Sequence, residues 1–168
     1  MKSFILVFIS FFMLVTAIAV NASEQQMSVN NILVEKNQRK MYLRHNDEIL
    51  YSYDIALGSD PVGHKKQEGD GKTPEGKYVI SGRNPTSKYH LSLRISYPNA
   101  RDIEVAKQNK VSPGGDIMIH GLPNRLPSFL HQFLQKKDWT AGCIAVSNKD
   151  IEEIWDLVAD GTAIFIKP

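Results

Sequence analysis

The sequence has almost no cysteine: Cys143 is the only one among 168 residues. An intramolecular disulfide is therefore impossible, and the fold must be stabilised by a hydrophobic core. The lone thiol lies in the segment DWTAGCIAVSN, residues 138–148. It is either a small buried residue or a group used for its chemistry, because an unpaired cysteine in an exported chain is a candidate reactive thiol.

The sequence also lacks a strong charge of either sign. The formal net charge is +2, which does not favour a nucleic acid or another polyanion as a partner. Internal repeats and low-complexity linkers are absent as well. The length is that of one ordinary domain.

Metal and nucleotide motifs are missing or incomplete. The five histidines form no H-x-x-x-H pair, so we expect no metal and no cofactor. GKTPEGKY, residues 71–78, has the spacing of a phosphate loop, but Tyr78 stands where a serine or threonine is required. Pro74 removes an N–H, and a strand-like YVISG follows instead of a helix. We expect a turn at Thr73–Gly76. The S-x-x-K pattern of an acylated serine is also absent.

The N-terminus carries an uncharged apolar run, Phe4–Val20, behind a single lysine. Val20 and Ala22 satisfy the small-residue rule for cleavage before Ser23, which predicts a signal peptide at residues 1–22. An uncleaved anchor is the alternative, because the run is just long enough to span a bilayer. Both interpretations predict that residues 23–168 form a single exported domain, with membrane contact only if the leader is retained.

Short strands dominate the rest of the chain. Alternating or β-branched runs bounded by turn residues predict strands at residues 31–36, 39–45, 48–58, 78–82, 91–97, 116–120 and 162–166. Helical patterns predict short helices at 100–109 and 127–137, and a third helix that Ser147 and Asp150 begin with a capping box. We therefore expect a mostly β fold with a few short helices.

Taken alone, the residues around Cys143 leave its role open. Gly142 lets backbone approach the sulfur, and consecutive N–H groups at such a turn can form an oxyanion hole. His120 ends the predicted strand 116–120 and is followed by Gly121, so it is a candidate base for the thiol. A Cys–His pair, a buried inert cysteine and a redox thiol are all compatible with this pattern.

Three segments together resemble one known family. GDGKTPEGKYVI, IMIHG and WTAGCIAVSN…IWDLVADGTAIFI are similar to the L,D-transpeptidase family (YkuD-type catalytic domain), whose members are exported cell-wall enzymes. The resemblance runs from about Asn31 to Lys167. It implies a β-sandwich or mixed-sheet fold in which the family's His-Gly maps onto His120-Gly121 and its Ser/Thr-x-Gly-Cys maps onto residues 140–143.

The resemblance implies roles for these residues. Cys143 would be the nucleophile and His120 the base, with the Gly121 carbonyl fixing the imidazole tautomer. Backbone N–H groups of Gly142, Cys143 and Ala141 would stabilise the oxyanion. Trp139 and Tyr97 are candidates for lining the cleft, although core packing is the alternative for both.

The chain departs from the family pattern at three places. Ala141 stands where many members have a second histidine, and Ala145 stands where many have Arg or Asn. The spacer between His120 and Cys143 is longer than usual and includes the predicted helix 127–137. This insert carries His131, which we keep as a second-choice base or substrate contact.

The implied reaction is acyl transfer on peptidoglycan stem peptides in the periplasm or cell envelope. Cys143 would attack the carbonyl between the third and fourth residues of a tetrapeptide stem and release D-Ala. A neighbouring stem or another amine would then take the acyl group from the thioester. A hydrolytic carboxypeptidase or amidase using the same thioester is an alternative, as is a non-catalytic wall-binding module or redox protein.

Overall fold

The computed structural model describes residues 27–168, so the predicted leader at residues 1–22 lies outside the described part. Among the described residues, no helix has the length and apolar character needed to cross a membrane.

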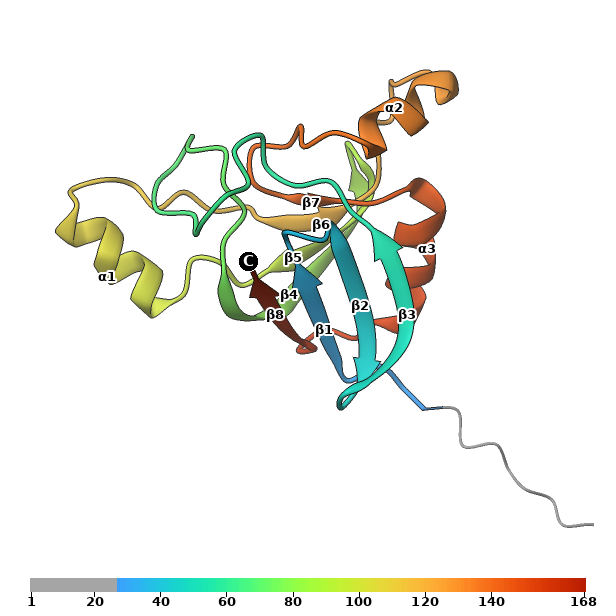
Figure 1. Ribbon diagram of the computed structural model, residues 1–168, viewed down its shortest axis with the longest axis horizontal. Coiled ribbons are helices and arrows are strands. Elements are labelled where there is room, and N and C mark those ends of the chain that lie inside the picture. Colours follow the sequence, from blue (N-terminus) through green and yellow to red (C-terminus); the bar gives the residue numbers. More distant parts are fainter. Residues whose placement is uncertain (1–26) are drawn as a thin grey trace, which may run out of the picture.

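The described chain is mostly β, which confirms the predicted fold class. Its strands are β1 (Asn31–Glu35), β2 (Lys40–His45), β3 (Glu48–Asp54), β4 (Gly76–Ser87), β5 (His90–Ile95), β6 (Met118–His120), β7 (Ile144–Ala145) and β8 (Ala163–Lys167). The helices are α1 (Ala100–Gln108), the 3₁₀ turn η1 (Ser128–Leu130), α2 (His131–Gln135) and α3 (Asn148–Leu157). Figure 1 shows α1 and α2 on different sides of the body.

All eight described strands belong to one mixed sheet in the order β3-β2-β1-β8-β4-β5-β6-β7. The β1–β8 and β6–β7 pairs are parallel, and the other pairs are antiparallel. The last strand, β8, therefore pairs with the first, β1. Strands β6 and β7, which adjoin the candidate site, lie at one end of the sheet order.

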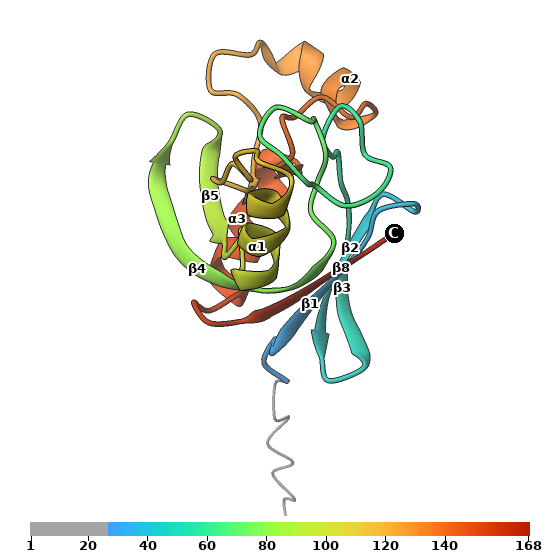
Figure 2. The same cartoon turned by 90° about the vertical axis from the view of Figure 1, so that its left-hand side faces the viewer.

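The long strand β4 joins the two halves of the sheet. Residues Gly76–Val79 pair with β8, whereas Ile80–Ser87 pair with β5. Register shifts after Ile80 and Asn84 mark irregularities, and such bulges bend a strand and increase its twist. Figure 2 shows the resulting bend. The predicted strand at residues 78–82 covered only the middle of β4.

The bend brings the far ends of the sheet together. Beyond β3, Ala56 exchanges two backbone hydrogen bonds of 2.8 Å with Ala145 of β7, and Gly58 forms a further bridge to Thr140. The predicted strand 48–58 is therefore shortened to β3. After Asp54 the chain separates from β2 and pairs with the segment that carries Cys143.

Apolar side chains from both halves form one core with α3. Ile151 and Ile154 of α3 are fully buried, and the helix packs against β5 and β6. The Ser147 hydroxyl accepts a 3.0 Å bond from the Asp150 N–H, which confirms the predicted start of this helix. The reciprocal half of the predicted capping box is not formed. A complete box instead begins α1, between Asn99 and Asp102.

The insert between β6 and β7 is less helical than its pattern predicts. Only η1 and the five residues of α2 are helical. Phe129 and Phe133, which a continuous helix over 127–137 would place on one face, are 79% and 57% exposed. The segment projects from the body (Figure 1), so no neighbouring element buries that face and the helix has little packing to lengthen it.

Close backbone packing at Gly58 gives a first prediction. A methyl group at Gly58 would lie 2.0 Å from the Gly71 carbonyl oxygen, a backbone atom that cannot move aside easily. We expect Gly58→Ala to lower the free energy of unfolding by about 2–3 kcal/mol. At Gly82 an added methyl meets nothing within 4 Å, so Gly82→Ala should change it by less than about 0.5 kcal/mol. Urea unfolding followed by circular dichroism measures both, and equal midpoints would contradict the packing argument.

Candidate active site

His120 ends β6 and is almost wholly buried, with 3% of its surface exposed. Its Nδ1 lies 2.6 Å from the carbonyl oxygen of Gly121. A carbonyl can only accept a hydrogen bond, so Nδ1 carries the proton in the neutral ring. Nε2 then has a free lone pair, which is the state required of a general base.

The β6–β7 ladder places Cys143 on the same side of the sheet as His120. Ile119 is paired with Ile144, and His120 with Ala145. Side chains alternate along strands, so Ile119 and Ile144 share the core face and His120 and Ala145 share the other. Cys143 comes directly before β7 and two positions before Ala145, so alternation continued by one residue would put its side chain on the His120 face.

In this structure the thiol is hydrogen-bonded to backbone just before β6. Cys143 Sγ donates to the carbonyl oxygen of Asp116, which lies 3.4 Å away. Within residues 27–168, no hydrogen bond joins Sγ to the His120 ring. Catalytic hydrogen bonds are often loose or absent in unliganded sites and form when substrate binds.

Burial shifts both candidate reacting groups toward their neutral forms. It lowers the pKa of the His120 imidazole below 6.5, and the bond to Gly121 opposes this shift. Burial also raises the pKa of the Cys143 thiol above 9.0, and the nearby Asp116 carboxylate adds to the increase. Both shifts therefore favour the neutral thiol and the neutral imidazole.

Thr140 holds the backbone turn before the cysteine. Its Oγ1 donates to the Cys143 carbonyl at 2.8 Å and accepts from the Gly142 N–H at 3.1 Å. Gly142 has φ +133°, and a Cβ there would lie 2.6 Å from the Lys72 carbonyl oxygen. The glycine is therefore required by both its conformation and its surroundings.

The turn leaves two of the three proposed backbone donors free. The Gly142 N–H is engaged with Thr140. Within the described residues, the N–H groups of Ala141 and Cys143 have no hydrogen-bond partner. These two N–H groups flank the glycine and are the donors available to a ligand at the sulfur.

Two aromatic rings enclose the imidazole. Tyr89 is tilted over His120 with ring centroids 4.5 Å apart, and Trp139 meets the imidazole edge-on at 5.8 Å. The backbone N–H of Trp139 bonds to the Leu57 carbonyl, which holds the residue beside the bent sheet. The sequence indicated Trp139 but not Tyr89, because Tyr89 lies in the β4–β5 turn, far from any motif.

Two buried polar atoms near His120 are unsatisfied. Among residues 27–168, Ser92 Oγ and Trp139 Nε1 are the only buried side-chain nitrogen or oxygen atoms without a hydrogen-bond partner. Ser92 is directly opposite His120 in the β5–β6 ladder, and Trp139 touches its ring. Each orphaned group costs about 1–3 kcal/mol, and both lie beside the candidate base.

Asn148 supports the backbone after His120. Its Oδ1 accepts from the Leu122 N–H at 2.7 Å, and a Cβ on Gly121 would lie 2.7 Å from the same oxygen. Because Gly121 has no side chain, the start of α3 can lie close to it. The Gly121 carbonyl in turn accepts the hydrogen bond from His120 Nδ1. Sequence reasoning missed Asn148, which lies five residues beyond the cysteine at the start of α3.

The structure does not bring the other two sequence candidates to this cluster. Tyr97 is 5% exposed in the core, where its hydroxyl donates to the Pro113 carbonyl and its ring packs edge-on against Tyr78. This matches the core-packing alternative for Tyr97. His131 lies in α2, and its Nε2 is 3.2 Å from the Leu126 carbonyl of the same insert. Within the described part of the chain, neither residue contacts His120 or Cys143.

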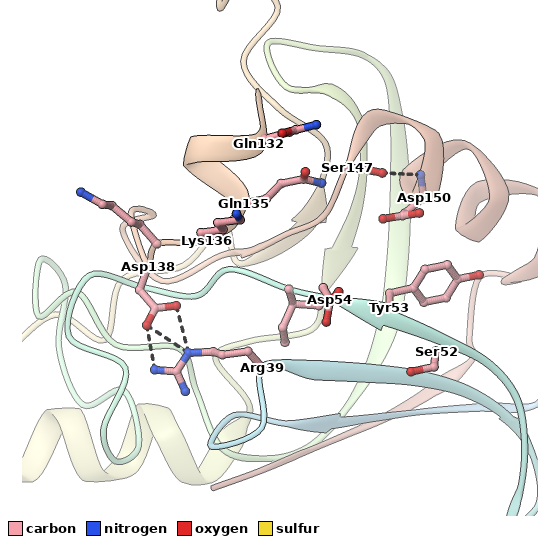
Figure 3. A pocket seen from close by; sticks show the side chains of 12 residues that line it. Arg39, Ser52, Tyr53, Asp54, Gln132, Gln135, Lys136, Asp138, Ser147 and Asp150 are labelled. Atoms are coloured by element: carbon pink, nitrogen blue, oxygen red, sulfur yellow. Dashed lines mark hydrogen bonds and ion pairs between the residues drawn. The ribbon is translucent and has the colours of Figure 1, made fainter. Parts of the chain in front are cut away.

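A polar pocket of about 710 Å³ lies beside the cysteine segment. Figure 3 shows Gln132, Gln135 and Lys136 of the insert on one side and residues of β3 on the other. Asp138, bound to Arg39 at 2.7 Å, stands at one end, and Ser147 belongs to the lining as well. The two ends of the segment 138–147 thus line this pocket, whereas Cys143 and His120 do not. Within residues 27–168, no group of three His, Cys, Asp or Glu side chains is placed to hold a metal.

The chain matches one known family over most of its length. The family model of the L,D-transpeptidase catalytic domain, YkuD, matches residues 17–166. The chain therefore belongs to this family, which confirms the resemblance inferred from the three sequence segments.

Individual relatives are distant and longer. YafK of Escherichia coli K12, a candidate L,D-transpeptidase, is 29% identical over 141 residues, which are 82% of this chain and 49% of YafK. The helical cell shape determining protein Pgp2 of Campylobacter jejuni has a solved structure with 27% identity and TM-score 0.59, covering 86% of this chain and 51% of Pgp2. Bd1075 of Bdellovibrio bacteriovorus is 30% identical with TM-score 0.56, covering 84% and 48%. The chain spans about half the length of these three proteins.

The pKa shifts give a second prediction. Because the folded protein raises the pKa of Cys143, its alkylation by iodoacetamide should be slow at pH 7 and rise with an apparent pKa above that of an ordinary thiol. The rate would be read by intact-protein mass spectrometry between pH 5 and pH 10, with N-acetylcysteine as the reference. A fast rate that is already constant at pH 6–7 would instead indicate a thiolate–imidazolium pair and contradict the neutral resting state.

Proposed function

We propose that this protein is an exported peptidoglycan L,D-transpeptidase with a single catalytic domain over residues 23–168. The observation that carries the proposal is the placement of His120 and Cys143 on one face of the β6–β7 ladder, within a chain of this family. Family membership supports peptidoglycan stem peptides as substrates and the periplasm or cell envelope as the location.

The first half-reaction forms a thioester. Cys143 turns from the Asp116 carbonyl toward Nε2 of His120, which takes the thiol proton as sulfur attacks the carbonyl of the third stem residue. The N–H groups of Cys143 and Ala141 donate to the oxyanion. The carbon–nitrogen bond to D-Ala then breaks, and the imidazolium returns its proton to the departing amine.

The second half-reaction returns the enzyme to its resting state. An amine of a neighbouring stem, or another amine, attacks the thioester while His120 accepts a proton from it. The new amide forms, and the sulfur leaves as the thiolate and regains a proton from the imidazolium. A thioester suits this step because it reacts readily with amines.

The orphaned polar atoms support a ligand at this place. Ser92 Oγ and Trp139 Nε1 lie beside His120 without partners, and buried polar groups in native structures are almost always satisfied. A substrate or an ordered water beside the imidazole supplies what they lack. Tyr89 and Trp139 would hold the ring in place and limit access of bulk water to it.

Cys143→Ala tests the catalytic proposal. The protein lacking its leader is incubated with purified tetrapeptide muropeptides, and the products are read by mass spectrometry. We expect dimers joined between third residues with the wild type and no turnover with Cys143→Ala. Its thermal midpoint should stay close to that of the wild type, because the side chain is small and only half-buried.

The same assay separates the alternatives. Loss of D-Ala without dimers would identify a hydrolase that uses the same cysteine. If the wild type shows neither product, no thioester on Cys143 and no mass shift with a carbapenem, the enzyme proposal is wrong.

A further inference from the structure

An exposed apolar cluster lies in the insert between β6 and β7. Phe129, Leu130 and Phe133 are 79%, 36% and 57% exposed. η1 runs directly into α2, so the two phenylalanines, four positions apart, lie close together. The other large hydrophobic side chains exposed among residues 27–168 are scattered along the chain, where single exposure is ordinary. Exposed apolar side chains that gather in one place instead mark an interaction surface.

The apolar cluster is separate from the polar pocket on the other side of the insert. Gln132 and Gln135 line that pocket, and so do the carboxylates of Asp54, Asp138 and Asp150, whereas none of the three apolar residues does. The insert projects from the body (Figure 1). It therefore has one polar side turned toward the sheet and one apolar side that no described element covers.

The insert is basic and contains no acidic residue. The sequence has no Asp or Glu between residues 121 and 137, and Arg125, Lys136 and Lys137 are exposed. In the described part of the chain, no ion pair involves any of these three cations. Lys137 Nζ lies 4.2 Å from the centroid of the Phe133 ring, so one of the charges lies directly beside the apolar cluster.

This combination fits a membrane surface better than a protein. Short segments bind the bilayer interface when their Lys and Arg side chains contact anionic headgroups and their Phe and Leu side chains enter the boundary with the acyl chains. A stable protein interface needs roughly 800 Å² of complementary surface from each partner. A projecting segment with three exposed apolar side chains offers far less, whereas a bilayer deforms around a few side chains.

We propose that the insert between β6 and β7 binds peripherally to a membrane that contains anionic lipid. The apolar cluster enters the headgroup region, and the three cations contact lipid phosphates. The interaction uses no residue of the candidate active site and is separate from the reaction proposed above. Because the insert leads from β6 into the segment that carries Cys143, the bound membrane would lie beside that site.

Co-sedimentation with lipid vesicles tests the proposal. The protein lacking residues 1–22 keeps the whole core and cannot bind through its leader. It is mixed with vesicles of phosphatidylcholine alone, or of phosphatidylcholine with phosphatidylglycerol, and the bound fraction is measured. We expect binding to the phosphatidylglycerol vesicles to be at least about tenfold tighter, because each cation near an anionic surface adds attraction. This binding should weaken as salt is added, since salt screens the charges.

Two double variants separate the apolar contribution from the charged one. Phe129→Ser with Phe133→Ser should weaken binding to the phosphatidylglycerol vesicles by on the order of tenfold or more, because both rings lose their burial in the interface. Lys136→Gln with Lys137→Gln should also weaken binding and make it less sensitive to salt. All four side chains are exposed, so the thermal midpoints should stay close to that of the wild type.

Helix α1 offers a matched control on a different side of the body. Ile103 is 51% exposed, and Lys107 is exposed four positions later. Ile103→Ser with Lys107→Gln removes one apolar side chain and one charge, as in the insert, and should bind vesicles like the wild type. Tryptophan fluorescence adds a local measurement. The emission of Phe133→Trp should shift to shorter wavelength with phosphatidylglycerol vesicles, and that of Ile103→Trp should not.

Three results would overturn the inference. These are a wild type that does not bind the phosphatidylglycerol vesicles, a Phe129→Ser and Phe133→Ser variant that binds as well as the wild type, and a control variant that binds as weakly as the insert variants. A concentration-dependent dimer that the phenylalanine variant abolishes would mean that a second copy of the chain covers the cluster, and would overturn it as well. None of these measurements needs a muropeptide, so the outcome is independent of the proposed function.

Discussion

The site depends on a parallel pairing only two residues long. Pairing of Ile119 with Ile144 and of His120 with Ala145 aligns β6 and β7. A shift by one residue would turn Cys143 to the face opposite His120, because strand side chains alternate. The register is maintained from the core side by Ile119 and Ile144, both fully buried. Packing of these two isoleucines in the core therefore fixes where His120 and Cys143 lie relative to each other.

The bent sheet stabilises this pairing from the opposite edge. Ala56 bonds to Ala145 on the side of β7 away from β6, so the short strand is held between two neighbours. The close approach also explains the small residues. An added methyl group would collide with backbone at Gly58 and at Gly142, and with the Ser59 hydroxyl at Gly71. The glycines that look like ordinary turn residues in the sequence are the points at which three segments of backbone make contact.

Burial shifts both candidate reacting groups toward their neutral forms, because it lowers the pKa of His120 and raises the pKa of Cys143. In the reaction proposed above, proton transfer would take place in this buried environment, where low polarity strengthens hydrogen bonds from the turn.

Sequence alone determined the mostly β class, the start of α3 and the family, because each depends on local pattern or on motifs contiguous in the chain. The turn predicted at Thr73–Gly76 was wrong, since residues 71–75 form no assigned turn and Gly76 begins β4. The sequence also indicated His120 and Cys143 as candidates. Only the tertiary structure placed them on one face, since 23 positions and a projecting insert separate them. It also placed Tyr97 in the core and added Tyr89 and Asn148 to the candidate site. Such placements arise from pairing between distant strands, which no local pattern encodes.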